Sequence, residues 1–255
     1  MNKFWSGVGV VAALHGVAAP VLAAQACSRQ SPAHTVALLE LYTSEGCSSC
    51  PPADQFVGGL RAAGVAQDQA VLLSLHVDYW NYIGWKDPFS RAAFTERQRY
   101  LSELAGSRAV YTPEIFVAGR ELRNWSNGVP AAVKRINDTP AQANIHIALG
   151  LVGAGGLPVE VSAASAKGGT LFIALTESAV ASRVTAGENQ GRTLRHDFVV
   201  REWLTPVALG RDGKAAVARA LAIPPGAVLK NLGISAFVQS ERGEVLQAFS
   251  QGVCM

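Results

Sequence analysis

Two cysteines stand where a buried strand gives way to a helix, in the run Leu38 to Pro52 with the sequence LLELYTSEGCSSCPP. Cys47 and Cys50 are separated by two serines, and the two prolines that follow fit the first turn of a helix, where a missing N–H costs no hydrogen bond. A helix N-terminus carries partial positive charge and therefore stabilises a thiolate. The pattern predicts thiol–disulfide exchange, in which an exposed Cys47 attacks and Cys50 resolves the mixed disulfide.

Two other functions fit the same pair of cysteines. A static, structural disulfide is the first alternative, in a non-enzymatic binding module. The second is copper delivery through Cys47, Cys50 and His76, because soft thiolates and an imidazole suit copper. The sequence favours exchange over a structural disulfide because the pair stands at the start of a helix, next to proline and after a buried strand. It favours exchange over copper delivery because a packed residue at the end of a strand is the simpler interpretation of His76. A tetrahedral zinc site also lacks a fourth ligand. No cofactor is therefore predicted.

The elements around the pair predict a parallel α/β unit. Thr35 to Tyr42 and Ala70 to Val77 are nearly continuous apolar runs, as expected of strands covered on both faces, and Pro51 to Ala63 joins them as a helix. Two buried strands joined by a helix form a parallel pair. Glu40 interrupts the first strand, and a carboxylate there is costly unless it has a function or a partner. Further elements are expected in the order helix Asp87 to Leu104, strand Glu114 to Val117, strand Glu121 to Trp125 and helix Asn127 to Asp138.

The pattern changes near Ala143. Apolar residues then alternate with others, the period-two pattern of strands with one covered face. Short strands separated by glycine-rich turns predict an antiparallel sandwich, with Ala215 to Ala222 as its one helix. The predicted fold class is thus an α/β domain, residues 34–140, followed by a mostly antiparallel β-sandwich-like domain, residues 143–255. The strands are expected around Ile145 to Leu151, Val159 to Ala163, Leu171 to Thr176, Arg195 to Val207, Leu232 to Gln239 and Glu244 to Ser250.

The order of elements in the first half resembles that of the thioredoxin-like superfamily. Strand, C-x-x-C, helix, strand, helix, X-Pro and strand all occur in the family's order. The resemblance implies that the Thr112–Pro113 bond is cis and that these two residues bind the backbone of the substrate beside the cysteines. It also implies that Glu40 is the proton acceptor for Cys50, although it is Glu rather than Asp and lies one residue further upstream than is usual.

Longer motifs resemble one bacterial family of secreted, thioredoxin-like proteins described as domain of unknown function 1223. They are LYTSEGCSSCPPAD, LHVDYWNYIGWKDPF, VYTPEIFVAGR and GENQGRTLRHDFVVREW, which span most of the mature chain. The resemblance implies the two-part layout and no substrate.

The first 26 residues predict a secretory signal peptide. Lys3 is followed by an apolar, alanine-rich run to Leu22 and by Ala24-Gln25-Ala26, a small-x-small cleavage site. The run is too short and too interrupted for a membrane span. A periplasmic or secreted protein is expected, with a lipid anchor on Cys27 as the alternative. The net charge of +3 is too small to predict nucleic-acid binding. The exchange chemistry of the cysteine pair makes protein thiols and disulfides the expected partners.

Export would place the four cysteines where disulfides persist. Cys47 and Cys50 pair by proximity, which leaves Cys27 and Cys254 near the two ends of the mature chain. Chain ends often lie close together in compact folds, so a Cys27–Cys254 disulfide is predicted.

Two further segments have open interpretations. The insert Asp78 to Trp85, DYWNYIGW, is either a substrate platform beside the cysteines or a lid packed over the edge of the sheet. Residues 187–202 hold charges of both signs, and a hairpin with a solvated, self-neutralising pattern is favoured there over an anion or partner site. The charged residues and the histidine of this segment are Glu188, Arg192, Arg195, His196, Asp197, Arg201 and Glu202.

Overall fold

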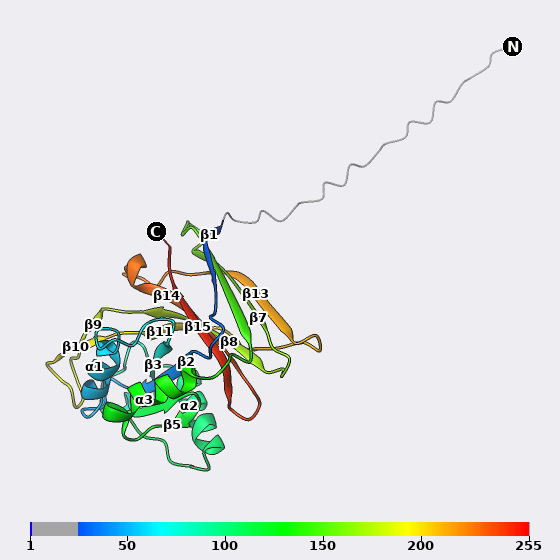
Figure 1. Ribbon diagram of the computed structural model, residues 1–255. Coiled ribbons are helices and arrows are strands. Elements are labelled where there is room, and N and C mark those ends of the chain that lie inside the picture. The colour runs from blue at the N-terminus through cyan, green and yellow to red at the C-terminus, as the bar shows by residue number, and fades with distance from the viewer. Residues whose placement is uncertain (2–24, 255) are drawn as a thin grey trace.

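The computed structural model describes Met1 and residues 25–254 of the protein (Figure 1). The predicted signal peptide falls almost entirely outside these residues. The described part is mostly β-structure, with three α-helices: α1 (Pro51–Gly59), α2 (Ala92–Leu104) and α3 (Trp125–Asn137). In the same part of the chain, no helix is both long and apolar enough to cross a membrane.

The predicted parallel unit around the cysteines is present. Strand β2 (Ala37–Thr43) pairs in parallel with β3 (Ala70–His76) over their full lengths, and α1 connects them. Every residue of both strands is buried, which accounts for their nearly continuous apolar sequences. Strand β4 (Glu114–Val117) runs antiparallel to β2 on its other side and is followed by β5 (Arg120–Glu121).

The predicted fold class, an α/β domain followed by a separate β-sandwich, is wrong. Strands of the second half continue the sheet of the first half, so that one mixed sheet of nine strands has the order β15-β14-β8-β11-β3-β2-β4-β5, with β12 paired to β8. The junction is the parallel pairing of β11 with β3. A strand pattern specifies which face of a strand is buried but not which strand lies beside it, and β11 fills the edge of β3 that a self-contained first domain would leave open. The residue bounds given for two domains stay a prediction. The added strands are β8 (Thr170–Glu177), β11 (Val199–Trp203), β12 (Val207–Ala208), β14 (Leu232–Gln239) and β15 (Val245–Gly252).

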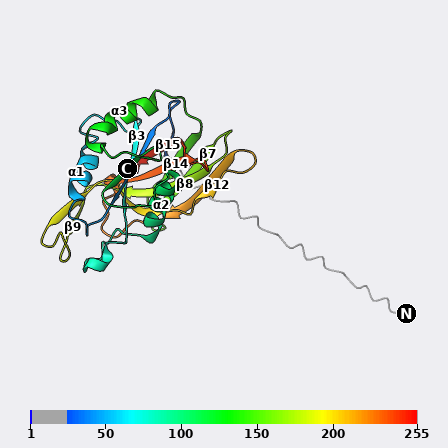
Figure 2. The ribbon, with the colours of Figure 1, turned by 90° about the horizontal axis from the view of Figure 1, so that it is seen from below.

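Helices cover both faces of the β2–β3 region. Helices α1 and α3 pack on the face that carries Leu39 and Leu41, whereas α2 packs on the face that carries Leu38 and Tyr42. Figure 2 shows α2 and α3 on opposite sides of β3. Because side chains alternate along a strand, neighbouring residues of β2 belong to different cores.

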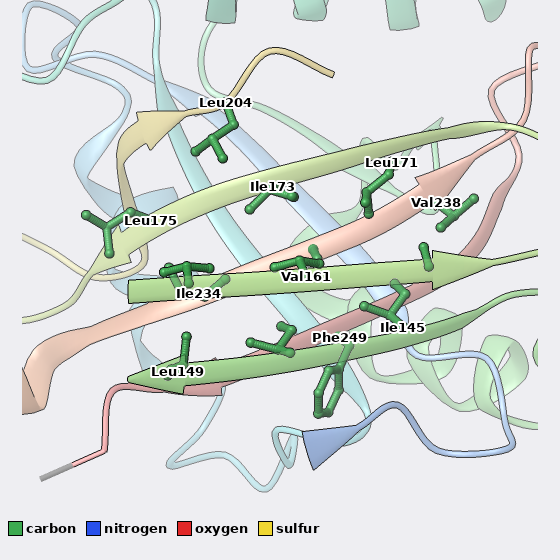
Figure 3. Close-up of a cluster of buried hydrophobic side chains, with 14 of the residues drawn as sticks. Ile145, Leu149, Val161, Leu171, Ile173, Leu175, Leu204, Ile234, Val238 and Phe249 are labelled. Carbon is green, nitrogen blue, oxygen red and sulfur yellow. The ribbon is translucent and has the colours of Figure 1, made fainter. Parts of the chain in front are cut away.

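A second sheet of four strands covers the part of the large sheet that lies away from α1. Its order is β1-β6-β7-β13. Figure 3 shows the core between the two sheets, where Ile145, Leu149 and Val161 of the small sheet meet Ile173 and Ile234 of the large one. The strands are β1 (Gln25–Gln30), β6 (Asn144–Gly150), β7 (Leu157–Ala164) and β13 (Lys214–Leu221).

The helix predicted at 215–222 is wrong. This segment is β13, which pairs with β7 over eight positions from Lys214↔Ala164 to Leu221↔Leu157. Alanine favours a helix by only a fraction of a kcal/mol per residue, so a complete ladder of interstrand hydrogen bonds overrides it. The short 3-10 turn Leu229–Asn231 then leads into β14.

The predicted pairing of Cys27 with Cys254 is confirmed. Their Cα atoms lie 6.2 Å apart, and the disulfide joins β1 to the segment after β15. Figure 1 shows the C-terminal end of the chain close to β1. The two ends of the described chain are therefore covalently joined across the small sheet and the large one.

Candidate functional site

Cys47 and Cys50 form a disulfide at the start of α1. Their Cα atoms are 5.5 Å apart, and Cys50 is the N-cap residue of the helix. The main-chain carbonyl of Cys50 accepts hydrogen bonds from the N–H groups of Ala53 and Asp54 at 2.9 and 3.1 Å. The local sequence therefore builds the expected junction of strand, disulfide and helix.

The expectation of an exposed Cys47 is wrong, because neither cysteine is reached by solvent. Both residues have an exposed fraction of 0%, although Ser48 and Ser49 between them are exposed. The loop is covered from outside by residues 184–192, which connect β9 (Val180–Arg183) to β10 (Thr193–His196). Figure 1 shows β9 and β10 beside α1.

Asn189 fastens this covering segment to the cysteine loop. Its side chain is fully buried, and its amide nitrogen donates to the carbonyls of Glu45 and Cys47 at 2.8 and 3.0 Å. The neighbouring Glu188 accepts a hydrogen bond from the N–H of Ser48 at 2.9 Å. Hydrogen bonding from Ser48 holds the pKa of Glu188 below its usual value.

Glu45 is a buried carboxylate two residues before Cys47. One of its oxygens accepts from the indole N–H of Trp85 at 2.9 Å, and the other lies 3.2 Å from Nε2 of His196. The main-chain N–H of Glu45 donates to Asp87 at 2.8 Å. A carboxylate with these partners orders the loop that carries Cys47 and places a negative charge next to it.

His196 and Asp54 complete a group of buried charges behind the disulfide. Asp54 lies one helical turn after Cys50, and its Oδ2 accepts from the hydroxyl of Thr43 at 3.2 Å. Its Oδ1 is 3.9 Å from Nδ1 of His196. Burial opposes protonation of His196, but the nearby carboxyl groups of Asp54 and Glu45 outweigh it and raise the pKa of His196 to about 9. At neutral pH His196 is therefore protonated, and it lies between the side chains of Glu45 and Asp54.

The stability of the protein should depend on the protonation of His196. Its folded-state pKa of about 9 exceeds the ordinary value of 6.5, so its contribution is fully present below about pH 6.5 and is lost as the pH rises through 9. We expect the free energy of unfolding to fall by up to about 3 kcal/mol across this window in the wild type. Urea titrations at pH 6, 7.5 and 9 measure it. In His196→Gln this fall should be absent, and an equal fall in both proteins would contradict the assignment.

His76 lies against this group but is already paired. Its Nδ1 is 2.7 Å from Oδ2 of Asp87, and both side chains are fully buried. Burial alone would raise the pKa of Asp87, but charge and hydrogen bonding from His76 lower it below the usual value. The rings of His76 and His196 meet edge to face at 4.9 Å. Within residues 25–254 no three His, Cys, Asp or Glu side chains are placed to hold a metal ion together.

Thr112 and Pro113 lie at the same end of the sheet as the cysteine loop. The Thr112–Pro113 bond is cis, as predicted. Trp80 connects Thr112 to the cysteine loop. Its indole N–H donates to the hydroxyl of Thr112 at 2.7 Å, and it packs so closely on Gly46 that a Cβ added there would lie 3.0 Å from Trp80 Cβ.

The aromatic insert packs onto the cysteine loop through Trp80 and Trp85. The 3-10 turn Asn81–Ile83 follows Trp80 and presents Tyr82, of which 83% is exposed. The insert therefore packs against the cysteine loop, whereas its role as a substrate platform stays a prediction.

The structure does not place Glu40 where a proton acceptor for Cys50 is needed. Glu40 lies on the α2 face of β2, and α1 with Cys50 lies on the other face. Its carboxylate is bound by Arg97, with Nη2 at 3.0 Å from Oε2. Asp54, Glu45 and His196 are ionisable groups that lie on the cysteine side instead.

Sequence reasoning missed three residues of the site: Asp54, Asp87 and Asn189. The signal for Asp54 was its place next to Ala53, whose side chain packs in the core under α1, because a charge buried there requires a partner. The predicted hairpin within residues 187–202 is displaced: Thr193–His196 pairs with Val180–Arg183, and His196 is buried and not part of a solvated pattern. Gly58 allows the approach of this hairpin, because a Cβ there would lie 2.7 Å from Oδ2 of Asp197.

The chain is similar to two solved structures. A crystal structure of a protein from Agrobacterium tumefaciens has 24% sequence identity and a TM-score of 0.57, with 86% of this chain and 93% of the other covered. HBP35 of Porphyromonas gingivalis has 15% identity and a TM-score of 0.64, with 88% and 76% covered. At such identities the likeness shows the fold alone. A comparison with the curated proteins finds no match.

One protein family matches most of the chain. Residues 38–239 match the family described as Protein of unknown function (DUF1223), and this span contains nearly all of β2, together with α1, the aromatic insert and the segment that covers the cysteines. Because the match extends over more than half of the chain, the protein belongs to the DUF1223 family.

Proposed function

We propose that this protein is a periplasmic or secreted thiol–disulfide oxidoreductase that acts on the thiols and disulfides of other proteins through Cys47 and Cys50. The observation that carries the proposal is the disulfide at the N-terminus of α1 with an ionisable group, His196 between Glu45 and Asp54, packed behind it. A structural disulfide needs no buried charges beside it, and such groups are costly to bury without a function.

The reaction would proceed in two exchanges. In the reductive direction the thiolate of Cys47 attacks one sulfur of a partner disulfide, and the other partner sulfur leaves as a thiolate. The thiolate of Cys50 then attacks the sulfur of Cys47, which releases the second partner sulfur and forms the Cys47–Cys50 disulfide. Two electrons pass from the pair to the partner, and the oxidative direction is the reverse.

The relationship to thioredoxin-like proteins is part of this proposal at the level of the local site. It concerns the unit β2–α1–β3 with its cysteine pair and the proline at 113. It does not extend to the overall fold, in which strands of the second half complete the sheet.

A structural disulfide is the second candidate function of the pair. The complete burial of Cys47 and Cys50 favours it, since an exchange catalyst has to expose its attacking sulfur. Copper delivery has no comparable support, because within residues 25–254 no three His, Cys, Asp or Glu side chains are placed to hold a metal ion together.

The reduction potential of the pair separates the two candidates. Equilibration of a Cys27→Ser/Cys254→Ser variant against glutathione measures it without interference from the second disulfide. A midpoint between about −120 and −270 mV places the pair among exchange catalysts. A midpoint below about −300 mV identifies a structural disulfide and refutes the proposal.

The two cysteines should differ in their mixed disulfides. In Cys50→Ser the attacking Cys47 remains, so a covalent complex with a disulfide-containing protein substrate should accumulate and be visible on a non-reducing gel. In Cys47→Ser no such complex should form, and the rate of substrate reduction should fall to that of the uncatalysed reaction. Equal trapping by both variants would contradict the assignment of Cys47 as the attacking residue.

A further inference from the structure

The segment that covers the cysteine pair is a compact loop of its own. Residues 184–192 close on themselves, with the N–H of Val184 bound to the carbonyl of Arg192 at 3.0 Å and that of Gly191 bound to Val184 at 2.9 Å. Val184 and Asn189 are fully buried, whereas Glu188 and Gln190 are exposed. The loop comes from about 140 residues further along the chain, as the contact of Glu188 with Ser48 shows. We call residues 184–192 the cap loop.

The cap loop binds main-chain atoms of the cysteine loop. The amide of Asn189 donates to the carbonyls of Glu45 and Cys47, and the carboxylate of Glu188 accepts from the N–H of Ser48. Arg192 holds Asn189 in place, because its Nη1 donates to Asn189 Oδ1 at 2.8 Å. The peptide groups of an extended polypeptide offer the same kinds of group, an N–H donor and an oxygen acceptor, as the side chains of Asn189 and Glu188 do here.

We propose that the cap loop occupies the peptide groups of Glu45, Cys47 and Ser48 in place of an extended segment of a partner protein, and so keeps the disulfide inaccessible until it is displaced. The inference rests on the proposed exchange function and adds its regulation and the kind of partner. A partner segment that takes over these three hydrogen bonds would release the cap loop and expose Cys47 in the same step. The disulfide would then meet bound polypeptides and be shielded from small thiols.

Asn189→Asp tests the proposal with little change in shape. A carboxylate would face the two carbonyls that the amide now serves, so the cap loop should open more often. We expect the Cys47–Cys50 disulfide to be reduced by a water-soluble phosphine at least ~10-fold faster than in the wild type, since the loss of two hydrogen bonds shifts an opening equilibrium by about this factor or more. Timed quenching, alkylation and mass spectrometry of the cysteine peptides measure the rate for each disulfide separately.

The chain offers two matched controls. Asn137 also donates from its amide to two main-chain carbonyls, of Thr35 and Gln69, both at 2.9 Å, but on α3 and away from the cap loop. Asn137→Asp therefore reports what general destabilisation alone does to the rate. The Cys27–Cys254 disulfide in the same molecules is an internal reference, and its reduction rate should be the same in the wild type and in Asn189→Asp.

The proposal that the cap loop shields the disulfide is supported if Cys47–Cys50 is reduced faster in Asn189→Asp than in Asn137→Asp while the Cys27–Cys254 rate is unchanged. Equal rates in the two variants overturn it. An unfolded peptide with one cysteine, used as the attacking thiol, tests the partner: its attack on the wild type should be faster than that of glutathione, and equal rates overturn the docking of a polypeptide. These outcomes are independent of the reduction potential, so the cap and the exchange function can fail separately.

Discussion

Replacement of Arg97 by methionine should lower the free energy of unfolding by about 3–5 kcal/mol, because it leaves the carboxylate of Glu40 buried without its charge partner. The two side chains are almost completely inaccessible, and the guanidinium binds both carboxylate oxygens, with Nε at 2.5 Å from Oε1 and Nη2 at 3.0 Å from Oε2. Burial alone would lower the pKa of Arg97, but the charge of Glu40 raises it above its usual value.

Arg97 also has contacts that are independent of its charge pair. Its guanidinium lies over the rings of Phe172 and Phe237, both at 4.8 Å from the ring centroid, and over Trp203 at 5.4 Å. It joins α2 to β8, β11 and β14, so the pair at Glu40 connects the two halves of the chain through the face opposite the cysteines.

The double variant Glu40→Gln/Arg97→Met separates lost charge from lost packing. Its unfolding free energy should lie well above that of Arg97→Met, because no buried charge remains unpaired. Urea titration of the wild type, both single variants and the double variant gives the coupling energy. A loss below about 1 kcal/mol in Arg97→Met, the range of exposed ion pairs, would contradict this account.

Removal of the Cys27–Cys254 disulfide should destabilise the protein by up to about 5 kcal/mol. The two residues are 227 positions apart in sequence, and the chain-entropy model assigns the largest effects to the longest loops. The Cys27→Ser/Cys254→Ser variant, compared with the wild type by urea titration under oxidising conditions, measures the difference.

Cys47→Ser/Cys50→Ser is the matched control for loop length. Its disulfide closes a separation of three residues, for which the same model gives only about 2 kcal/mol. A larger loss from this short loop than from the long one would show that chain entropy does not set the stability of the two disulfides. Reducing agent should bring the wild type close to the variant that lacks the long disulfide.

Local features of this protein followed directly from its sequence. The spacing of Cys47 and Cys50 predicted their disulfide, and the prolines after them predicted the start of α1. The apolar runs predicted β2 and β3 as buried, parallel strands, and the position of the two remaining cysteines predicted the Cys27–Cys254 bridge. Each of these depends on residues that are adjacent in the chain, on a spacing that leaves no other partner, or on the proximity of chain ends.

The arrangement around the cysteines was decided only by tertiary structure. Side chains alternate between the two faces of β2, and Glu40 lies on the face away from α1. The sequence does not say which of the two faces a given helix will cover. His196 and Asn189 reach the cysteine loop because β11 joins β3 and brings the preceding hairpin over α1. Sequence periodicity identifies the buried face of an element but not its neighbour. Here residues more than 140 positions away along the chain place a charged side chain beside the disulfide and cover it.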